Sequence, residues 1–255
     1  MDIAHYTSLE TLIKHILPTR QLRFSSLSKT NDPAEYKSRV DFLVYEGTKQ
    51  DPFFQPDCYQ SVIEEMNLAL RKKIKIACFS SDSPQRHPRS EYRDECWGKP
   101  RMWAQYGNNH EGVCLVFDRD KLASLVKENH DLFLNCHVLY ENFTGISDLL
   151  NPIVTHQIID VCDFVKQHVK GFGDLHLLRK HEDWASEDEV RLIIYDESDE
   201  DYAYANVWDG LKYIVLGSQA APGYVDALVR LVDKPLKQWV WKPSVQQYQL
   251  IDLSS

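Results

Sequence analysis

Hydrophobic residues recur along the chain at two different spacings, one typical of strands and one typical of helices. Alternating or continuous apolar runs predict strands over residues 3–7, 21–27, 75–81, 112–118, 133–142, 188–197, 211–217 and 245–253. Apolar residues three and four apart predict helices over 8–17, 34–46, 58–73, 119–128, 147–171 and 219–233, and a short helical turn over 102–107. Strands and helices therefore follow one another, but the lengths of the connections are irregular.

Polar residues predict where the early elements begin and end. Ser8 is a typical N-cap for the first helix, and Pro18 should stop it because proline cannot continue a helix interior. Asn31 and Asp32, directly before a proline, predict a turn organised by bonds from their side chains to the backbone. They could instead line a cleft, since they follow the strand "LRFSS" closely.

These elements predict one mixed α+β domain over residues 1–255, with a helical insertion at about 34–73. The chain shows no internal repeat and no low-complexity linker. No glycine-rich phosphate loop follows any predicted strand, so the sequence supports neither a P-loop nor a Rossmann fold.

Composition narrows the class of protein only slightly. The 255 residues are 43% hydrophobic and 26% charged, which is typical of globular proteins. No apolar run approaches the roughly 20 residues of a membrane helix, and the start of the chain lacks the pattern of a signal peptide. We therefore expect a cytoplasmic protein with no membrane contact.

Six cysteines lie far apart and form no CxxC pair, so we expect no zinc or other metal site. Cys78 and Cys114 lie within apolar runs, which predicts buried thiols. Apolar alternation also predicts a shared core made of Cys78, Trp103, Val113, Cys114, Leu115, Phe117, Leu192 and Ile194.

The net charge of −9 argues against broad binding to nucleic acid. Two local basic segments remain candidates: "RKKIK" at 71–75 and the loop 83–101. The cations of that loop are Arg86, Arg89, Arg93, Lys99 and Arg101. A solvated loop is the simpler interpretation, and a nucleic-acid contact is the alternative.

Two strands present polar side chains in a pattern that could carry chemistry. On the first, His5 and Thr7 share one face and could hold ribose hydroxyls; the alternative is a histidine at a sheet edge. On the strand "EDEVRLIIY", Glu187, Glu189 and Arg191 lie opposite the apolar face, and such carboxylates could stabilise a developing sugar cation. The alternative there is a surface pair between a glutamate and an arginine.

Two aromatic residues lie three apart on the predicted turn 102–107. We expect Trp103 to fill the core. Tyr106 could stack on a flat ring near the strand ends, or could also belong to the core.

Several motifs in a fixed order resemble a bacterial family known as domain of unknown function 2971. They are "HYTS", "LRFSS", "NDPAE", "CFSS", "MWAQYG", "HEGVCLVFD", a tryptophan followed by "EDEVRLI", and "IVLG". The resemblance extends from His5 to about Gly217, and the loop between "CFSS" and "MWAQYG" is unusually long for the family. The family name implies no activity.

The order of these elements also resembles, more distantly, ADP-ribosyltransferases of the His-Tyr-Glu type. That resemblance implies a split, mixed or antiparallel β-sheet with helical insertions and a cleft for NAD as substrate. It implies that His5 and Thr7 hold the riboses, that Tyr106 packs on nicotinamide and that Glu189 is the catalytic carboxylate. Glu187 would be the first acid of an E-x-E pair. The other residues expected to contact NAD are Ser25 and Ser80.

The resemblance implies an enzyme that consumes NAD, transferring ADP-ribose to a protein, to a nucleic acid or to water, in the context of a toxin or of phage defence. The alternative is a non-catalytic module that binds a nucleotide or nucleic acid in the same cleft or through loop 83–101. The first of these requires His5, Tyr106 and Glu189 to converge on one pocket, with Glu189 on the same face of the sheet as His5.

Overall fold

A computed structural model describes residues 1–30, 43–45, 56–83, 94–130, 133–142, 153–155, 163, 166–167, 177–198 and 200–253. Within these residues, ten strands form one mixed sheet with the path β11-β2-β4-β1-β5-β12-β13-β14. β10 pairs with β4 away from this path, and β6 pairs with β10. The α+β class and the mixed sheet predicted from the sequence are confirmed.

The strands of this sheet run in antiparallel pairs except for β12 and β13, which are parallel. Their bounds are β1 Asp2–Thr7, β2 Gln21–Ser26, β4 Ile74–Ser81, β5 Val113–Asp118, β6 Phe133–His137, β10 Glu189–Tyr195, β11 Tyr202–Asn206, β12 Leu211–Leu216, β13 Leu236–Lys242 and β14 Gln247–Asp252. Two small parallel pairs lie outside the sheet: β3 Leu43–Tyr45 with β8 Ile153–Thr155, and β7 Leu139–Glu141 with β9 Arg179–His181.

The sheet splits along β4. One edge of β4 pairs with β10 over its whole length, from Ile74 to Ser80. The other edge is shared, because β2 pairs only at Lys75 and Ile76 and β1 pairs only at Ser80 and Ser81. β1 and β2 therefore diverge, and the edge of β4 between them, residues 77–79, has no strand partner.

One face of the sheet is covered by the helical segment between β1 and β2 and by α6 Arg119–Lys127 and α8 Pro222–Leu231. That segment is α1 Leu9–Thr11, η1 Leu12–Ile16 and α2 Leu17–Thr19. Leu12 and Ile16, Leu122 and Leu228 from these helices join a core that includes Phe79. These side chains follow the helical spacing of the sequence, so burial of one apolar stripe holds each helix on the sheet.

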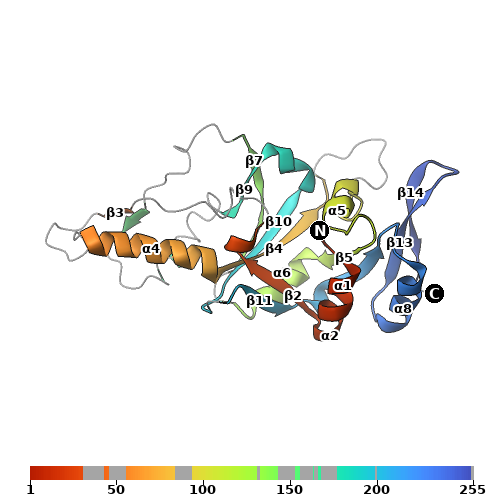
Figure 1. Ribbon diagram of the computed structural model, residues 1–255, viewed down its shortest axis with the longest axis horizontal. Coiled ribbons are helices and arrows are strands. Elements are labelled where there is room, and N and C mark those ends of the chain that lie inside the picture. Colours follow the sequence, from red (N-terminus) through yellow and green to blue (C-terminus); the bar gives the residue numbers. More distant parts are fainter. Residues whose placement is uncertain are drawn as a thin grey trace.

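The opposite face is covered at two places, with an interval between them. α4 Pro56–Lys73 packs Met66 and Leu70 against β4 and β10 at one end. α5 Pro100–Gln105 packs Trp103 against β1, β5 and β13 at the other end. Figure 1 shows α4 reaching away on one side of the molecule, with α8, β13 and β14 on the other. In the described part of the chain, no α-helix covers this face in the interval between α4 and α5.

The first helix differs from its prediction at Pro18. Ser8 is the N-cap, as expected, and accepts a bond from the Thr11 backbone. The helix then widens to a π-helix over Leu12–Ile16 and continues through Pro18 to Thr19, with Arg20 in the left-handed conformation. Pro18 lies at the start of α2, where a missing N–H is tolerated, so it does not end the helix.

Three predicted elements are wrong in part. The helix predicted over 34–46 contains β3, and the long helix predicted over 147–171 contains β8. The strand predicted over 133–142 divides into β6 and β7, because the backbone N–H of Val138 turns to bond to the Glu189 carbonyl. The turn predicted at Asn31 and Asp32, and most of the insertion before α4, lie outside the described residues.

Strands β9, β11 and β13 were not predicted, and neither were the short helices η2 Leu27–Lys29, η5 Glu182–Glu187 and η6 Trp208–Gly210. Seven of the eight predicted core residues are buried. The prediction was wrong for Cys78, whose side chain is exposed. β4 is apolar on both sides of it, but this position faces the uncovered interval of the sheet.

Candidate functional site

A pocket of about 610 Å³ lies at the split of the sheet. The unpaired edge of β4, residues 77–79, lines it between β1 and β2. The helical segment between β1 and β2 also lines the pocket, through Thr11, His15 and Ile16, on the face of the sheet that α6 and α8 cover. The pocket therefore exists because β1 and β2 part from each other, and its volume suits a ligand the size of a nucleotide or larger.

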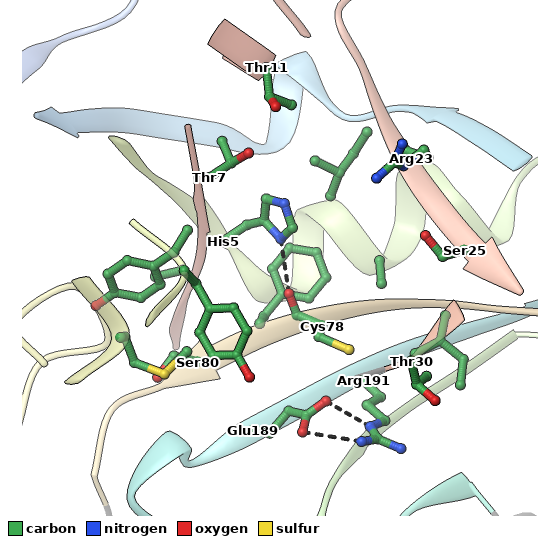
Figure 2. A pocket seen from close by; sticks show the side chains of 18 of the residues that line it. His5, Thr7, Thr11, Arg23, Ser25, Thr30, Cys78, Ser80, Glu189 and Arg191 are labelled. Atoms are coloured by element: carbon green, nitrogen blue, oxygen red, sulfur yellow. Dashed lines mark hydrogen bonds and ion pairs between the residues drawn. The ribbon is translucent and has the colours of Figure 1, made fainter. Parts of the chain in front are cut away.

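His5 occupies the gap between the strands. Its Nδ1 lies 3.0 Å from the Cys78 carbonyl oxygen, and a carbonyl can only accept, so Nδ1 donates (Figure 2). Burial lowers the pKa of His5, which keeps the ring neutral at pH 7. Nε2 of this tautomer is then a hydrogen-bond acceptor on the side of the ring away from Cys78.

Tyr6 holds β1 in place next to His5. Its hydroxyl donates to the Cys96 carbonyl at 2.8 Å, and its ring packs edge-on against Trp103 with centroids 5.2 Å apart. Gly112, directly before β5, allows its backbone to approach the end of β1, since a Cβ there would meet the Thr7 carbonyl at 2.3 Å. The "HYT" step thus anchors its middle residue in the core and leaves His5 and Thr7 at the pocket.

His5 and Glu189 both line the pocket but come from opposite faces of the sheet. Strand register gives Glu189 the same face as Ser80 and Ala4, whereas His5 alternates with Ala4 along β1. From the sequence we expected the two side chains on one face of the sheet, and the strand register shows that this expectation is wrong. One pocket joins the two only because it passes through the gap beside Cys78, so a ligand that touches both must extend through the split.

Glu189 is paired within the pocket wall rather than on the surface. Arg191 donates to it twice, from Nε at 2.7 Å and from Nη2 at 3.2 Å (Figure 2). Glu189 is 4% exposed and Arg191 1% exposed, so the alternative of a solvated surface pair is wrong. Burial favours a higher pKa, but the charges and hydrogen bonds of Arg191 and Lys180 outweigh it and lower the pKa of Glu189 to about 2.

Lys180 joins the two carboxylates. Its Nζ lies 2.7 Å from Glu187 Oε2 and 3.1 Å from Glu189 Oε2. The hydroxyl of Tyr106 donates to the other oxygen of Glu187 at 2.9 Å. Two buried carboxylates that would repel each other are therefore held together by one ammonium group between them.

The backbone that leads into β10 is also fixed. The Ser80 hydroxyl donates to the Glu187 carbonyl at 2.6 Å, and Lys99 donates to the same carbonyl at 3.3 Å. Lys99 also bonds Asp188 at 2.6 Å, and Asp188 adopts the left-handed conformation. Glu187 and Glu189 thus project from a rigid turn, which is the condition for precise placement of reacting groups.

All seven residues predicted for the site line this one pocket. They are His5, Thr7, Ser25, Ser80, Tyr106, Glu187 and Glu189. The structure therefore brings together segments that are up to 184 positions apart in the sequence, which is the separation of His5 from Glu189. The roles assigned to them stay predictions.

A known family covers part of the site. Residues 102–192 match the family model described as "Protein of unknown function (DUF2971)". The matched segment holds Tyr106, Glu187 and Glu189, together with Lys180 and Arg191, but not the strands that carry His5 and Ser25. No curated protein and no solved structure gives a significant match to the chain.

Among the lining residues that the sequence analysis did not assign to the site, three bear on its chemistry: Arg23, Cys78 and Lys180. Lys180 lies on the three-residue strand β9, which is too short to show a periodic signal. Arg23 lies on β2 between Gln21 and Ser25, and the alternation of "QLRFSS" would have placed it on their face. Cys78 was assigned to the core because the residues around it are apolar.

Three cations of the two basic segments, Lys75, Lys99 and Arg101, are buried or bonded within the protein. Lys75 of "RKKIK" is fully buried. Within loop 83–101, Lys99 is buried against Asp188, and Arg101 donates to the Asp183 carbonyl. Arg86, Arg89 and Arg93 lie outside the described residues.

Metal ligands and membrane spans were searched over the described part of the chain. No three His, Cys, Asp or Glu side chains gather there as a metal site, and no helix there is long and apolar enough to cross a membrane. The two carboxylates of the pocket bind Lys180, Arg191 and Tyr106 instead.

Proposed function

We propose that the pocket binds NAD and cleaves its bond to nicotinamide, passing ADP-ribose to a macromolecular acceptor or to water. The observation that carries this proposal is the continuous pocket through the split sheet, with His5 and Thr7 towards one end and Glu189 at the other. A dinucleotide has two riboses separated by a diphosphate, which suits a pocket with hydroxyl-binding groups at both ends.

In this proposal the first ribose is held by β1. The neutral His5 ring offers Nε2 as an acceptor for a ribose hydroxyl, because Nδ1 is committed to the Cys78 carbonyl. The hydroxyl of Thr7 makes no hydrogen bond to any other residue in the described part of the chain, so it remains available to the ligand. These contacts orient the substrate before the reaction and so reduce its entropic cost.

Glu189 acts on the second ribose. As the bond to nicotinamide breaks, its electron pair leaves with the ring and the sugar carbon takes on oxocarbenium character. The low pKa keeps Glu189 charged at neutral pH. One of its oxygens then accepts from a ribose hydroxyl, and the fixed negative charge beside the sugar is stabilising.

Tyr106 and Glu187 complete that end of the pocket. The bond from the Tyr106 hydroxyl to Glu187 fixes the orientation of the aromatic ring, whose face would pack on nicotinamide. Glu187 shares the Lys180 ammonium with Glu189, and in this proposal its carboxylate accepts a proton from an incoming nucleophile.

One observation favours a second candidate, a module that binds the nucleotide without cleaving it. Arg191 and Lys180 balance the charges of Glu187 and Glu189, and this reduces the net negative field at the sugar. NAD would then bind in the same pocket and remain intact.

Incubating the purified protein with NAD and measuring free nicotinamide distinguishes the two candidates. The first predicts release by the wild type and a loss of about 100-fold or more in Glu189→Gln, the size of effect seen when an electrostatic stabiliser is removed. Glu10→Gln is the matched control, because Glu10 pairs with Lys14 on the surface and does not line the pocket.

Binding of intact NAD with no nicotinamide release would select the second candidate. Full activity in Glu189→Gln would refute the catalytic role. Absence of any NAD binding to the wild type would exclude both candidates.

A further inference from the structure

β2 carries an arginine into the pocket without a carboxylate to bind it. The guanidinium carbon of Arg23 lies 4.5 Å from the centroid of the Tyr202 ring on β11. No hydrogen bond or ion pair joins this guanidinium to another residue in the described part of the chain. Figure 2 shows Arg23 and Ser25 on one side of the gap, with His5 and Thr7 on the other.

Two neighbouring cations, Arg20 and Lys29, each form an ion pair with a carboxylate. Arg20 binds Asp233 at 3.2 Å, and Lys29 binds Asp201 at 3.1 Å. Burial is the main cause of the lowered pKa of His5, and the nearby charge of Arg23 lowers this pKa further. Arg23 therefore lines the pocket with a positive charge that no carboxylate in the described part of the chain neutralises.

The charges that line the pocket are unequal. Its acids are Glu187 and Glu189, and both are bonded to Lys180. Its other cations are Arg191, which binds Glu189, Lys29, which binds Asp201, and Arg23, so Arg23 gives the described lining an excess of positive charge in a chain whose net charge is −9. Such an excess in a concave site favours an anionic ligand.

We propose that Arg23 binds a phosphate group of the ligand, with the Ser25 hydroxyl as a second donor. This inference rests on the proposed function and deepens it by assigning the anionic part of the substrate. The planar guanidinium presents paired N–H donors that match two phosphate oxygens. Packing on Tyr202 restrains the guanidinium plane, which lowers the entropy lost on binding.

The position of Arg23 fits a phosphate between two riboses. It lies on β2, across the gap from His5, and lines the same pocket as Glu189. The same chemistry could come from two sources, the diphosphate of a dinucleotide or the backbone of a nucleic-acid acceptor. Separate probes distinguish them.

Isothermal titration calorimetry with ADP-ribose, adenosine, inorganic pyrophosphate and a short single-stranded oligonucleotide tests the proposal. Arg23→Gln should bind ADP-ribose about 10- to 100-fold more weakly than the wild type, the range expected for a lost hydrogen bond to a charged group. Adenosine, which has no phosphate, should bind the two proteins equally. Arg23→Lys should recover part of the affinity, because it restores the charge without the paired donors.

Arg20→Gln is the matched control. Arg20 also lies near an aromatic ring, with its guanidinium carbon 5.5 Å from the Trp208 centroid, but it does not line the pocket. It should bind all four probes as the wild type does. Circular dichroism of each variant checks that the fold is retained.

The outcomes separate this inference from the proposed function. Wild-type affinity for ADP-ribose in Arg23→Gln, or an equal loss for adenosine, would overturn the phosphate site even if nicotinamide is released normally. Arg23-dependent binding of ADP-ribose by a protein that never cleaves NAD would support the site and refute the activity. Dependence on Arg23 for the oligonucleotide alone would support a phosphate site for the acceptor, and no binding of any probe would overturn the inference.

Discussion

The pair between Arg191 and Glu189 gives the most specific prediction for stability. The change Arg191→Met removes both donors to Glu189 while filling much of the same volume. Lys180 is then the one remaining cation bonded to Glu189 in the described part of the chain. Since burial opposes the charged form, the pKa of Glu189 should rise above its unfolded value.

The size of the effect follows from two estimates. Lowering the pKa of Glu189 from 4.5 to about 2 corresponds to about 3 kcal/mol in favour of its charged form in the folded state. Removing one partner of a buried pair typically costs about 3–5 kcal/mol. We therefore expect Arg191→Met to lower the free energy of unfolding by about 3–5 kcal/mol at pH 7.

The loss should depend on pH in a definite direction. In the wild type the lowered pKa of Glu189 adds stability that is present above about pH 4.5 and is lost as pH falls toward 2. In the variant the raised pKa makes the charged form destabilising at neutral pH, and protonation relieves this at low pH. The difference in unfolding free energy between the two proteins should therefore shrink from pH 7 to pH 4.

Urea unfolding followed by circular dichroism at both pH values measures this difference. The double variant Glu189→Gln with Arg191→Met should lose less than the two single losses added together, because neither charge remains. The exposed Arg20, paired with Asp233, supplies a control whose change to Met should cost about 0–1 kcal/mol. A loss below about 1 kcal/mol in Arg191→Met, equal at both pH values, would refute the reasoning.

Three further predictions concern single side chains. Leu192→Ala should lower the unfolding free energy by about 2–5 kcal/mol, because Leu192 is fully buried; near-wild-type thermal stability would contradict the placement of this side chain in the core. Iodoacetamide should alkylate Cys78 in the native protein and Cys114 only after unfolding, and mass spectrometry showing equal rates would contradict the exposure of Cys78. NMR should show the pKa of His5 below 6.5, so that protonation costs stability as pH falls below 6.5; a pKa at or above 6.5 would contradict the buried, neutral ring.

Local pattern was enough to predict β1, β2, β4 and β10 and several residues of the site. The alternation in "HYT" and in "EVRLI" predicted which side chains share a face, and Tyr106 and Trp103 were placed on a helical turn that the structure contains. These predictions depend only on strand and helix geometry, which neighbouring residues determine.

Pairing across the sheet could not be read from the same pattern. The split at β4, and the opposite faces of His5 and Glu189, depend on which strands are neighbours and in what register. Lys180 and Cys78 were missed for the same reason, because their surroundings come from distant segments. Burial of the pair between Glu189 and Arg191 likewise depends on β6 and β9 lying beside β10.

The central claim is that NAD occupies the pocket at the split of the sheet. A crystal structure of the Glu189→Gln variant with NAD tests it most directly, because slowed cleavage should leave the dinucleotide intact. We expect density that passes between β1 and β2, with a ribose hydroxyl at His5 Nε2, a phosphate at Arg23 and the second ribose beside position 189. An empty pocket at saturating NAD, or a dinucleotide bound elsewhere, would contradict it.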